Sequence, residues 1–195
     1  MTKRALARLD LLAYNALVVM INGGGRVRDT SAVAATTVTV GSPADVTDAC
    51  ALWFLADEGP ANDMAVRRAA VKTLADQLLE MWQRPPAHLL LAKAEDRLVG
   101  TVFGKSRRDD PSTGQMSMLA VHPEWQRRGI GSQLVDAVLA ALVEDGCVRC
   151  RMYVAASDDQ VQRFYEKRGW TFSGRVEQSP DTAAPERVYL KEPLP

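Results

Sequence analysis

Two glycines follow a glutamine and two arginines in the segment Gln126-Arg127-Arg128-Gly129-Ile130-Gly131. Glycine lets the backbone approach a ligand closely, and the first N–H groups of a helix have no partner within that helix. Together with the positive end of the helix dipole, these N–H groups form an anion-binding site, to which Arg127 and Arg128 add charge. The segment therefore predicts phosphate binding, and a plain tight turn with two glycines is the alternative.

The elements on either side of this turn bear on the choice. A strand is expected over 115–121, just before the turn, and an apolar stripe from Leu134 to Val143 predicts a helix just after it, which ends at Gly146. The turn lacks the Lys and Ser or Thr of a P-loop, and it lacks the third glycine of the dinucleotide-binding fingerprint. The strand–turn–helix context therefore gives phosphate binding equal weight with a structural turn.

Hydrophobic periodicity and turn residues predict the other elements. Strands are expected at 37–40, 88–94, 97–105, 115–121, 149–154, 170–176 and 187–192, and helices at 46–56, 65–82, from the glycine turn to Gly146, and from a Ser157–Gln160 capping box to Arg168. The polar turn Glu95-Asp96 makes a hairpin, whereas the later strand–helix–strand crossover needs a parallel pair. The predicted fold is α/β, with a mixed, mostly antiparallel sheet that contains a parallel crossover and is flanked by helices.

The length of 195 residues suits one domain with an appendage. Residues 1–37 are expected to be an N-terminal appendage, with an amphipathic helix in the first twenty residues and a glycine-rich linker after it. Residues 38–195 are expected to form the domain. The appendage packs on the domain, mediates a contact such as a homodimer interface, or precedes the true start of the protein.

Charge and cysteine content exclude several classes of protein. Lys and Arg together number 24, as do Asp and Glu, so no basic field predicts nucleic acid as a partner. No run reaches the roughly 18 apolar residues that a membrane helix needs. The chain contains three cysteines, and this small, odd number argues against a disulfide framework. It favours a reducing compartment, and hence the cytoplasm. Cys147 and Cys150 have no second Cys or His pair nearby, so buried thiols and no metal are expected.

Several segments at consistent spacing resemble the GNAT acetyltransferase superfamily. The turn 126–131 is similar to its acetyl-CoA signature, which reads Gln or Arg, two residues, Gly, one residue, and Gly or Ala. Leu119–Pro123 matches the strand and proline that the family places before the turn, and Phe164–Trp170 matches its FYEKxGF segment. Tyr189–Lys191 resembles its closing strand. The resemblance covers about residues 38–195.

This resemblance implies acetyl-CoA as the co-substrate and a GNAT-like fold. In that fold two neighbouring strands separate, and the pantetheine arm lies between them like an extra strand. Backbone N–H groups from Arg127 to Ser132 would hold the pyrophosphate, and backbone groups of Leu119 and Val121 would pair with pantetheine. The family has Asn where this chain has Asp158. The residues expected to contact the cofactor are Leu119, Ala120, Val121, Gln126, Arg127, Arg128, Gly129, Ile130, Gly131, Ser132, Asp158 and Tyr165.

Attack of an amine on a thioester needs a neutral amine, a stabilised oxyanion and a proton for the departing thiolate. The resemblance assigns that proton to Tyr165, although the apolar stripe Val161, Phe164 and Tyr165 would face the core in any case. The strand before the turn contains no carboxylate. The general base is therefore sought at Glu58, acting through water, or at His122.

The predicted function is transfer of an acetyl group from acetyl-CoA to a primary amine of a small molecule, a peptide or a protein. One alternative is an acyltransferase that uses a different acyl-CoA. Another is a non-catalytic acyl-CoA sensor, which the missing carboxylate favours. The expected partners are acetyl-CoA and an unidentified amine acceptor, with neither nucleic acid nor a membrane.

Overall fold

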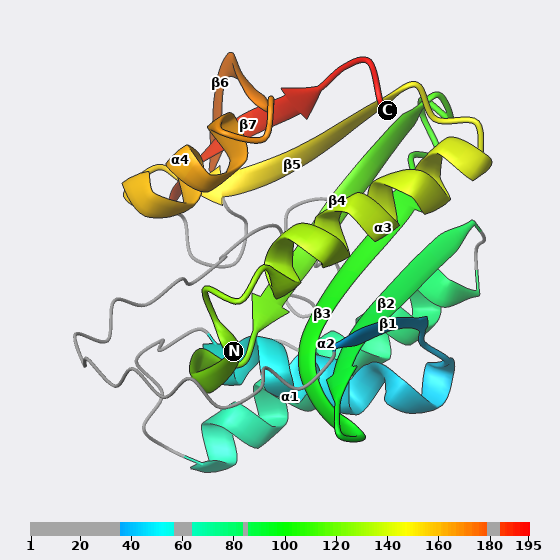
Figure 1. Cartoon of the computed structure of the whole chain (residues 1–195), viewed down its shortest axis with the longest axis vertical. Helices are drawn as coiled ribbons and strands as arrows, with labels where there is room; N and C mark the ends of the chain where they lie inside the picture. The colour runs from blue at the N-terminus through cyan, green and yellow to red at the C-terminus, as the bar shows by residue number, and fades with distance from the viewer. Residues whose placement is uncertain (1–35, 57–63, 84–85, 179–183) are drawn as a thin grey trace, which may run out of the picture.

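The computed structural model describes residues 36–56, 64–83, 86–178 and 184–195. Within these residues one seven-stranded sheet is accompanied by four α-helices and two short 3-10 helices (Figure 1). The strands are β1 (Thr37–Val40), β2 (Ala87–Ala94), β3 (Arg97–Ser106), β4 (Thr113–Val121), β5 (Arg149–Ala155), β6 (Thr171–Gln178) and β7 (Pro185–Lys191). The helices are η1 (Pro43–Asp45), α1 (Val46–Ala56), α2 (Met64–Trp82), η2 (Pro123–Trp125), α3 (Ile130–Glu144) and α4 (Asp159–Glu166).

The sheet has the strand order β1-β2-β3-β4-β5-β7-β6. Among the described strands only β4 and β5 run parallel, and the crossover between them passes through α3. β2 and β3 are joined by a tight turn at Glu95 and Asp96, whose φ angles of 50° and 64° suit a type I′ hairpin. The predicted α/β fold, with a mostly antiparallel sheet and one parallel crossover, is confirmed.

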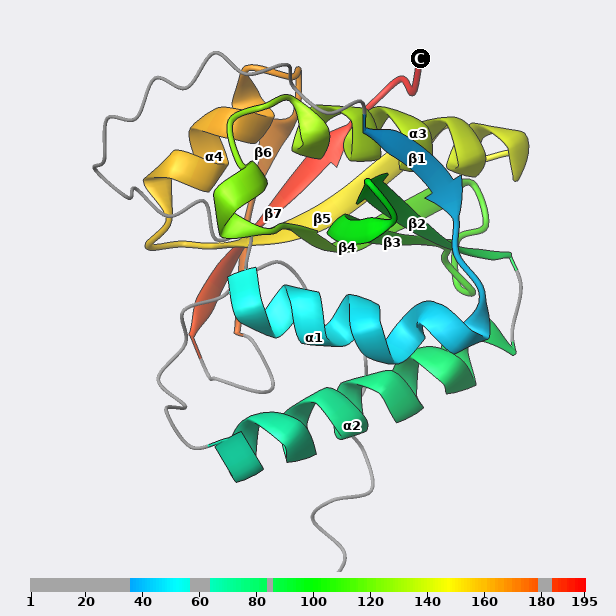
Figure 2. The ribbon, with the colours of Figure 1, turned by 60° about the horizontal axis from the view of Figure 1, so that its bottom comes forward.

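Helices cover both faces of the sheet. Figure 2 shows α1 and α2 on one face and α3 and α4 on the other. Successive side chains of a strand point to opposite faces, so each strand contributes to two cores. In β2, Leu89 and Leu91 belong to the core under α1 and α2, whereas Leu90 and Ala92 belong to the core under α3. Burial on both faces fixes the sheet between its two helix layers.

Glycines in β3 and β4 allow α3 to lie close to the sheet. A Cβ atom added to Gly104 would stand 2.4 Å from Val138 Cγ2 on α3. Added to Gly100 or Gly114, it would stand 2.8 or 2.7 Å from a leucine side chain of the same helix. Carbon atoms pack best at about 3.5–4.0 Å, so any larger residue here would push α3 outward. The glycines thereby set the position of α3, and with it the position of the turn that precedes this helix.

The start of α4 differs from the predicted one. The Ser157–Gln160 capping box is wrong, because Asp158 is the N-cap and its Oδ1 accepts a hydrogen bond of 3.0 Å from the N–H of Val161. An aspartate caps as well as a serine does, and its negative charge also interacts favourably with the helix dipole. The helix ends at Glu166, earlier than predicted.

The predicted appendage at residues 1–37 lies outside the described residues except for its last two. Thr37 already belongs to β1. The division into an appendage and a domain at residue 38 therefore stays a prediction. None of the described helices is long and apolar enough to cross a membrane.

Candidate active site

β4 and β5 pair only at their starts and then separate. The last pair of their ladder joins Gln115 to Arg151. β4 then continues to Val121 and β5 to Ala155 (Figure 1). No other described strand pairs with this edge of β4 beyond Gln115. The backbone N–H and C=O groups on this edge of β4 need hydrogen-bond partners. Because β5 does not pair with them, they are available to a ligand that lies between the two strands.

A β-bulge interrupts β4 along this stretch. The register with β3 shifts between Thr101, which lies opposite Ala120, and Phe103, which lies opposite Ser117. Met118 inside the bulge has a φ of 55°, a left-handed conformation that costs a non-glycine residue about 1–3 kcal/mol. Bulges are over-represented next to active sites, where they re-aim backbone and side chains. This bulge lies beside the segment predicted to pair with pantetheine.

The turn after β4 combines left-handed backbone with an open helix end. Arg127 and Gly129 have φ angles of 61° and 83°, and Gly129 is the N-cap of α3 without a side chain to cap it. The first N–H groups of α3 therefore have no side-chain cap. Gln126 holds the turn against β4, because its Nε2 donates to the carbonyl oxygen of Val121 at 3.2 Å. Backbone N–H groups that are free at a helix N-terminus are what an anion-binding site of this kind uses.

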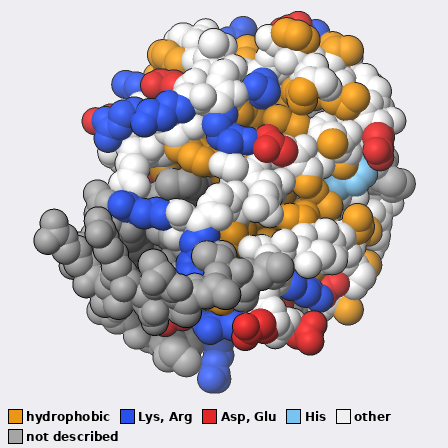
Figure 3. Space-filling view, in the orientation of Figure 1, with side chains coloured by type: hydrophobic (Ala, Val, Ile, Leu, Met, Phe, Trp, Pro, Cys, Tyr) orange, Lys and Arg blue, Asp and Glu red, His pale blue; other side chains and the backbone are white. Residues whose placement is uncertain are grey.

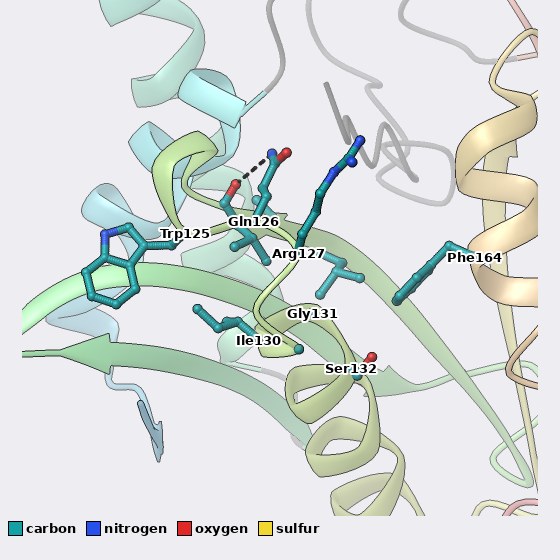
Figure 4. Close-up of a pocket in the computed structure, with 11 residues that line it drawn as sticks. Trp125, Gln126, Arg127, Ile130, Gly131, Ser132 and Phe164 are labelled. Carbon is teal, nitrogen blue, oxygen red and sulfur yellow. Dashed lines mark hydrogen bonds between the residues drawn. The ribbon is translucent and has the colours of Figure 1, made fainter. Parts of the chain in front are cut away.

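A cleft of about 230 Å³ lies beside the turn, between β4, the start of α3 and α4 (Figure 4). It is lined by Leu119, Ala120, Val121, Trp125, Gln126, Arg127, Gly129, Ile130, Gly131, Ser132 and Phe164. Phe164 comes from α4 and faces the turn across the cleft. A Cβ atom on Gly131 would stand 3.7 Å from Val121 Cγ2 and 3.9 Å from Phe164 Cζ. A side chain at Gly131 would therefore contact both walls of the cleft and take up space inside it.

Basic residues gather near this cleft. Arg127 and Arg128 belong to the turn, and Arg163, Lys167 and Arg168 belong to the end of α4 or follow it directly. Figure 3 shows Lys and Arg side chains around a hollow on the face of the molecule that carries α3 and α4. Positive charge beside an open helix N-terminus favours a ligand with several negative charges, such as a pyrophosphate.

Most of the predicted cofactor residues line this cleft, and Arg128, Asp158 and Tyr165 do not. Arg128 turns onto Trp125, with its guanidinium carbon 4.7 Å from a ring centroid, and its Nη2 donates to the carbonyl oxygen of Glu124. Asp158 uses its carboxylate to cap α4. A cofactor contact of either side chain stays a prediction.

Tyr165 lies in the core, directly after the cleft residue Phe164. It is 1% exposed, and its ring makes edge contacts with Phe164 and Trp170 at centroid distances of 4.9 and 5.7 Å. Burial raises the pKa of its hydroxyl well above the ordinary value of 10. The nearby Cys150 adds to this shift in pKa, and Arg168 opposes it. A tyrosine hydroxyl is protonated at neutral pH in any case, and the raised pKa makes this one a weaker acid.

Of the two candidate bases, Glu58 lies outside the described residues. His122 lies at the start of η2, and its Nε2 stands 2.9 Å from Nη2 of Arg97. Because an arginine only donates hydrogen bonds, this ring nitrogen is the acceptor. The lone pair that a base would use is thus occupied, which favours a structural role for His122 in the turn.

The Acetyltransferase (GNAT) family model matches residues 54–170, more than half of the chain. The chain belongs to the GNAT acetyltransferase family. This GNAT acetyltransferase shares its fold with Ard1 from Thermoplasma volcanium, which is 19% identical with a TM-score of 0.63, over 82% of this chain and 99% of that one.

Two further structures share the GNAT fold. The PaiA N-acetyltransferase of Thermoplasma acidophilum, solved in complex with coenzyme A, is 18% identical with a TM-score of 0.60, over 81% of this chain and 99% of that one. The ribosomal-protein-S18-alanine N-acetyltransferase of Escherichia coli is 16% identical with a TM-score of 0.60, over 82% of this chain and 94% of that one. At these identities the likeness concerns the fold alone.

Sequence reasoning about this GNAT acetyltransferase missed Phe164 as a residue of the cleft, since it was assigned to an apolar stripe and to the FYEKxGF segment but not to cofactor binding. The available signal was its position directly before Tyr165. Adjacent residues of a helix point about 100° apart, so when Tyr165 faces the core its neighbour points to the side. That side is the one on which the glycine turn lies.

Proposed function

We propose that this protein transfers the acetyl group of acetyl-CoA to a primary amine of a small molecule, a peptide or a protein. The observation that carries the proposal is the meeting of three features in one cleft: the open edge of β4, the uncapped start of α3 and the glycine turn. The turn suits the pyrophosphate of CoA, and the strand edge suits the amides of pantetheine. PaiA, which shares the fold, was solved with coenzyme A.

The orientation of the cofactor follows from the two strands. They separate toward their C-terminal ends, where the turn lies, and they meet at Gln115 and Arg151. With the pyrophosphate on the turn, the pantetheine arm runs back along β4 in place of a paired strand. The thioester at the end of the arm then lies toward the point where the strands meet.

In the reaction the lone pair of the amine nitrogen forms a bond to the carbonyl carbon of the acetyl group. The C–S bond then breaks, and its electron pair leaves with sulfur as a thiolate. The amine gives up one proton to a base or to water, and the thiolate takes one from an acid. We assign this acid to Tyr165, because its segment resembles the FYEKxGF segment of the family and because it directly follows the cleft residue Phe164. The products are the acetylated amine and free CoA thiol.

Thiol release from acetyl-CoA across a panel of amines, peptides and antibiotics tests this function. We expect release that depends on the acceptor, with one acetyl group added to its amine in the mass spectrum. Binding of CoA in calorimetry without release for any acceptor would instead indicate a sensor. Failure to bind CoA at all would contradict the proposal entirely.

A further inference from the structure

Gln115 and Arg151, the last pair before β4 and β5 separate, lie on the sheet face opposite α3. Their neighbours face α3: a Cβ atom on Gly114 would stand 2.7 Å from Leu142 Cδ1, and Cys150 belongs to the core under α3. Because side chains alternate along a strand, Gln115 and Arg151 point to the other face. In the proposed function, the thioester at the end of the cofactor's pantetheine arm lies at this place.

The helices α1 and α2 cover that face only in part. The core beneath them contains residues of β2, β3 and β4 but no described residue of β5 or β7. On β5 and β7 the buried apolar residues of this face are the pair Tyr153 and Val188. The first half of β5 instead carries two arginines on this face, Arg149 and Arg151, beside the point where the strands meet.

Arg151 is half-buried, and its hydrogen bonds and its ring contact are with neutral groups. Its Nε and Nη2 donate to Oε1 of Gln115 at 3.3 and 3.2 Å, and its guanidinium carbon lies 5.1 Å from the ring centroid of Tyr153. No ion pair within 4.0 Å joins Arg151 to a described carboxylate, although the charges of Glu177 and Asp109 act on it and raise its pKa. Burial is the main cause that lowers the pKa of Arg151. A guanidinium has five N–H donors, so donors remain for a ligand after these two bonds.

A second arginine strengthens the positive charge at this place. Arg107 directly follows β3, and its side chain is only 12% exposed. One of its nitrogens pairs with Asp109, while its Nη1 is buried without a hydrogen-bond partner in the described part of the chain. Arg107 is one of the charges that lower the pKa of Arg151, so the two guanidinium groups repel each other electrostatically.

The carboxylates in reach of Arg151 already have other partners. Asp109 pairs with Arg107, and Glu177 interacts with the hydroxyl of Tyr153 and raises its pKa, while both carboxylates also favour the charged form of Arg151. Charged groups that are partly removed from water are normally paired. A half-buried arginine held by an amide and a ring, beside a second arginine, is therefore suited to an anion that arrives with a ligand.

We propose that Arg151, supported by Arg107, binds a carboxylate of the acceptor, so that the acceptor is an amine that carries a carboxylate, as an amino acid does. The proposal rests on the proposed function, which places the thioester where β4 and β5 meet. The planar guanidinium matches a carboxylate with two parallel hydrogen bonds. A carboxylate anchored there brings the amine of the same molecule to the thioester. Nearby positive charge also favours the neutral, reactive form of that amine.

Matched acceptors test the proposal in the wild-type protein. The series consists of L-amino acids, the same amino acids as carboxamides, and short peptides that begin with Asp or Glu and end in a carboxamide. We expect kcat/KM for thiol release, expressed per neutral amine, to be about 10- to 100-fold higher for the amino acids than for their carboxamides. Use of the acidic peptides in place of free amino acids would assign the same carboxylate chemistry to a peptide acceptor.

Substitutions locate the effect at Arg151. Arg151→Gln is expected to raise KM for the carboxylates about 10- to 100-fold, to change KM for the carboxamides far less and to alter kcat little. Arg151→Lys keeps the positive charge but loses the planar guanidinium that can donate two parallel hydrogen bonds. It is expected to retain part of the preference for carboxylates over carboxamides. The matched control is Arg149→Gln, on the same strand and face, because Arg149 is already paired with Asp110 and Glu192 at 3.9 and 3.7 Å. That control is expected to keep the full preference.

Equal use of amino acids and carboxamides by the wild type would overturn the carboxylate site and leave acetyl transfer intact. An unchanged preference in Arg151→Gln would overturn it as well. If no compound of the series is acetylated, calorimetry on the protein saturated with CoA decides. Binding of amino acids that Arg151→Gln loses supports the site, and no binding of amino acids overturns it. Failure of acetyl transfer itself is seen separately, as absence of thiol release with every amine of the wider panel.

Discussion

At the scale of the residue, the proposed role of Tyr165 adds proton transfer to its packing in the core. Its ring contacts Phe164 and Trp170 in the core, and its hydroxyl is assigned the proton that the thiolate takes up. Tyr165→Phe removes the hydroxyl and keeps these ring contacts. We expect kcat to fall by about 100- to 10,000-fold, the contribution of a general acid, while acetyl-CoA affinity and stability change little.

Steady-state thiol release under conditions where chemistry limits the rate measures this effect, with calorimetry of acetyl-CoA as its control. Turnover near the wild-type value would show that Tyr165 only packs and that water or another donor protonates the thiolate. An equal loss of acetyl-CoA affinity would assign the hydroxyl to binding instead.

The same scale shows where sequence reasoning succeeds. The glycine turn was predicted because its signal is local: the residue types, their spacing and the adjoining helix are all read within twenty residues. The bulge at Met118 was not predicted, because it arises from the pairing of β4 with β3 and methionine gives no sign of a left-handed φ. The arginines Arg107 and Arg151 are 44 positions apart, and only the sheet brings them together.

At the scale of the element, α4 depends on its cap. Asp158 caps the first turn through the N–H of Val161. Asp158→Ala is expected to lower the free energy of unfolding by about 1 kcal/mol, and Asp158→Asn, which caps as well, is expected to lower it by much less. Urea denaturation of both variants measures the difference. If Asp158→Ala weakens CoA binding strongly without loss of stability, the side chain contacts the cofactor, as the family resemblance predicted.

The packing of α3 on β3 gives a second prediction at this scale. Gly104→Ala places a Cβ atom 2.4 Å from Val138 Cγ2 and is expected to destabilise the fold by about 1–3 kcal/mol. Val138→Ala removes the clashing methyl group, so the double variant should be more stable than the sum of the two single effects predicts. If the changes in the free energy of unfolding of the two single variants simply add up in the double variant, α3 accommodates the new Cβ atom without a clash with Val138.

The elements themselves were largely predictable, because alternation and helical spacing are properties of short windows. The capping box at Ser157 was wrong by one residue, since both Ser157 and Asp158 are good N-cap residues and the tertiary position of α4 selects between them. The separation of β4 and β5 after Gln115 has no sequence signal of its own. It entered the sequence analysis only through the family resemblance.

At the scale of the whole molecule, the division at residue 38 can be tested by shortening the chain. The first strand begins at Thr37, so a chain that starts at Ala35 keeps the sheet intact. We expect it to fold with a melting temperature near that of the full chain and to bind acetyl-CoA with the same affinity. Loss of solubility or a large fall in melting temperature would show that the first 34 residues stabilise the domain or an interface.

The most direct test of the account is calorimetry of CoA binding to the wild type, Gly131→Val and Ala140→Val. The valine at 131 adds a side chain whose Cβ atom contacts Val121 and Phe164 in the cleft, whereas Ala140 is an exposed residue of the same helix. We predict that the wild type and Ala140→Val bind CoA alike and that Gly131→Val binds it on the order of 100-fold more weakly with its fold intact. Equal affinity in all three proteins, or no binding by the wild type, would contradict the assignment of this cleft to acetyl-CoA.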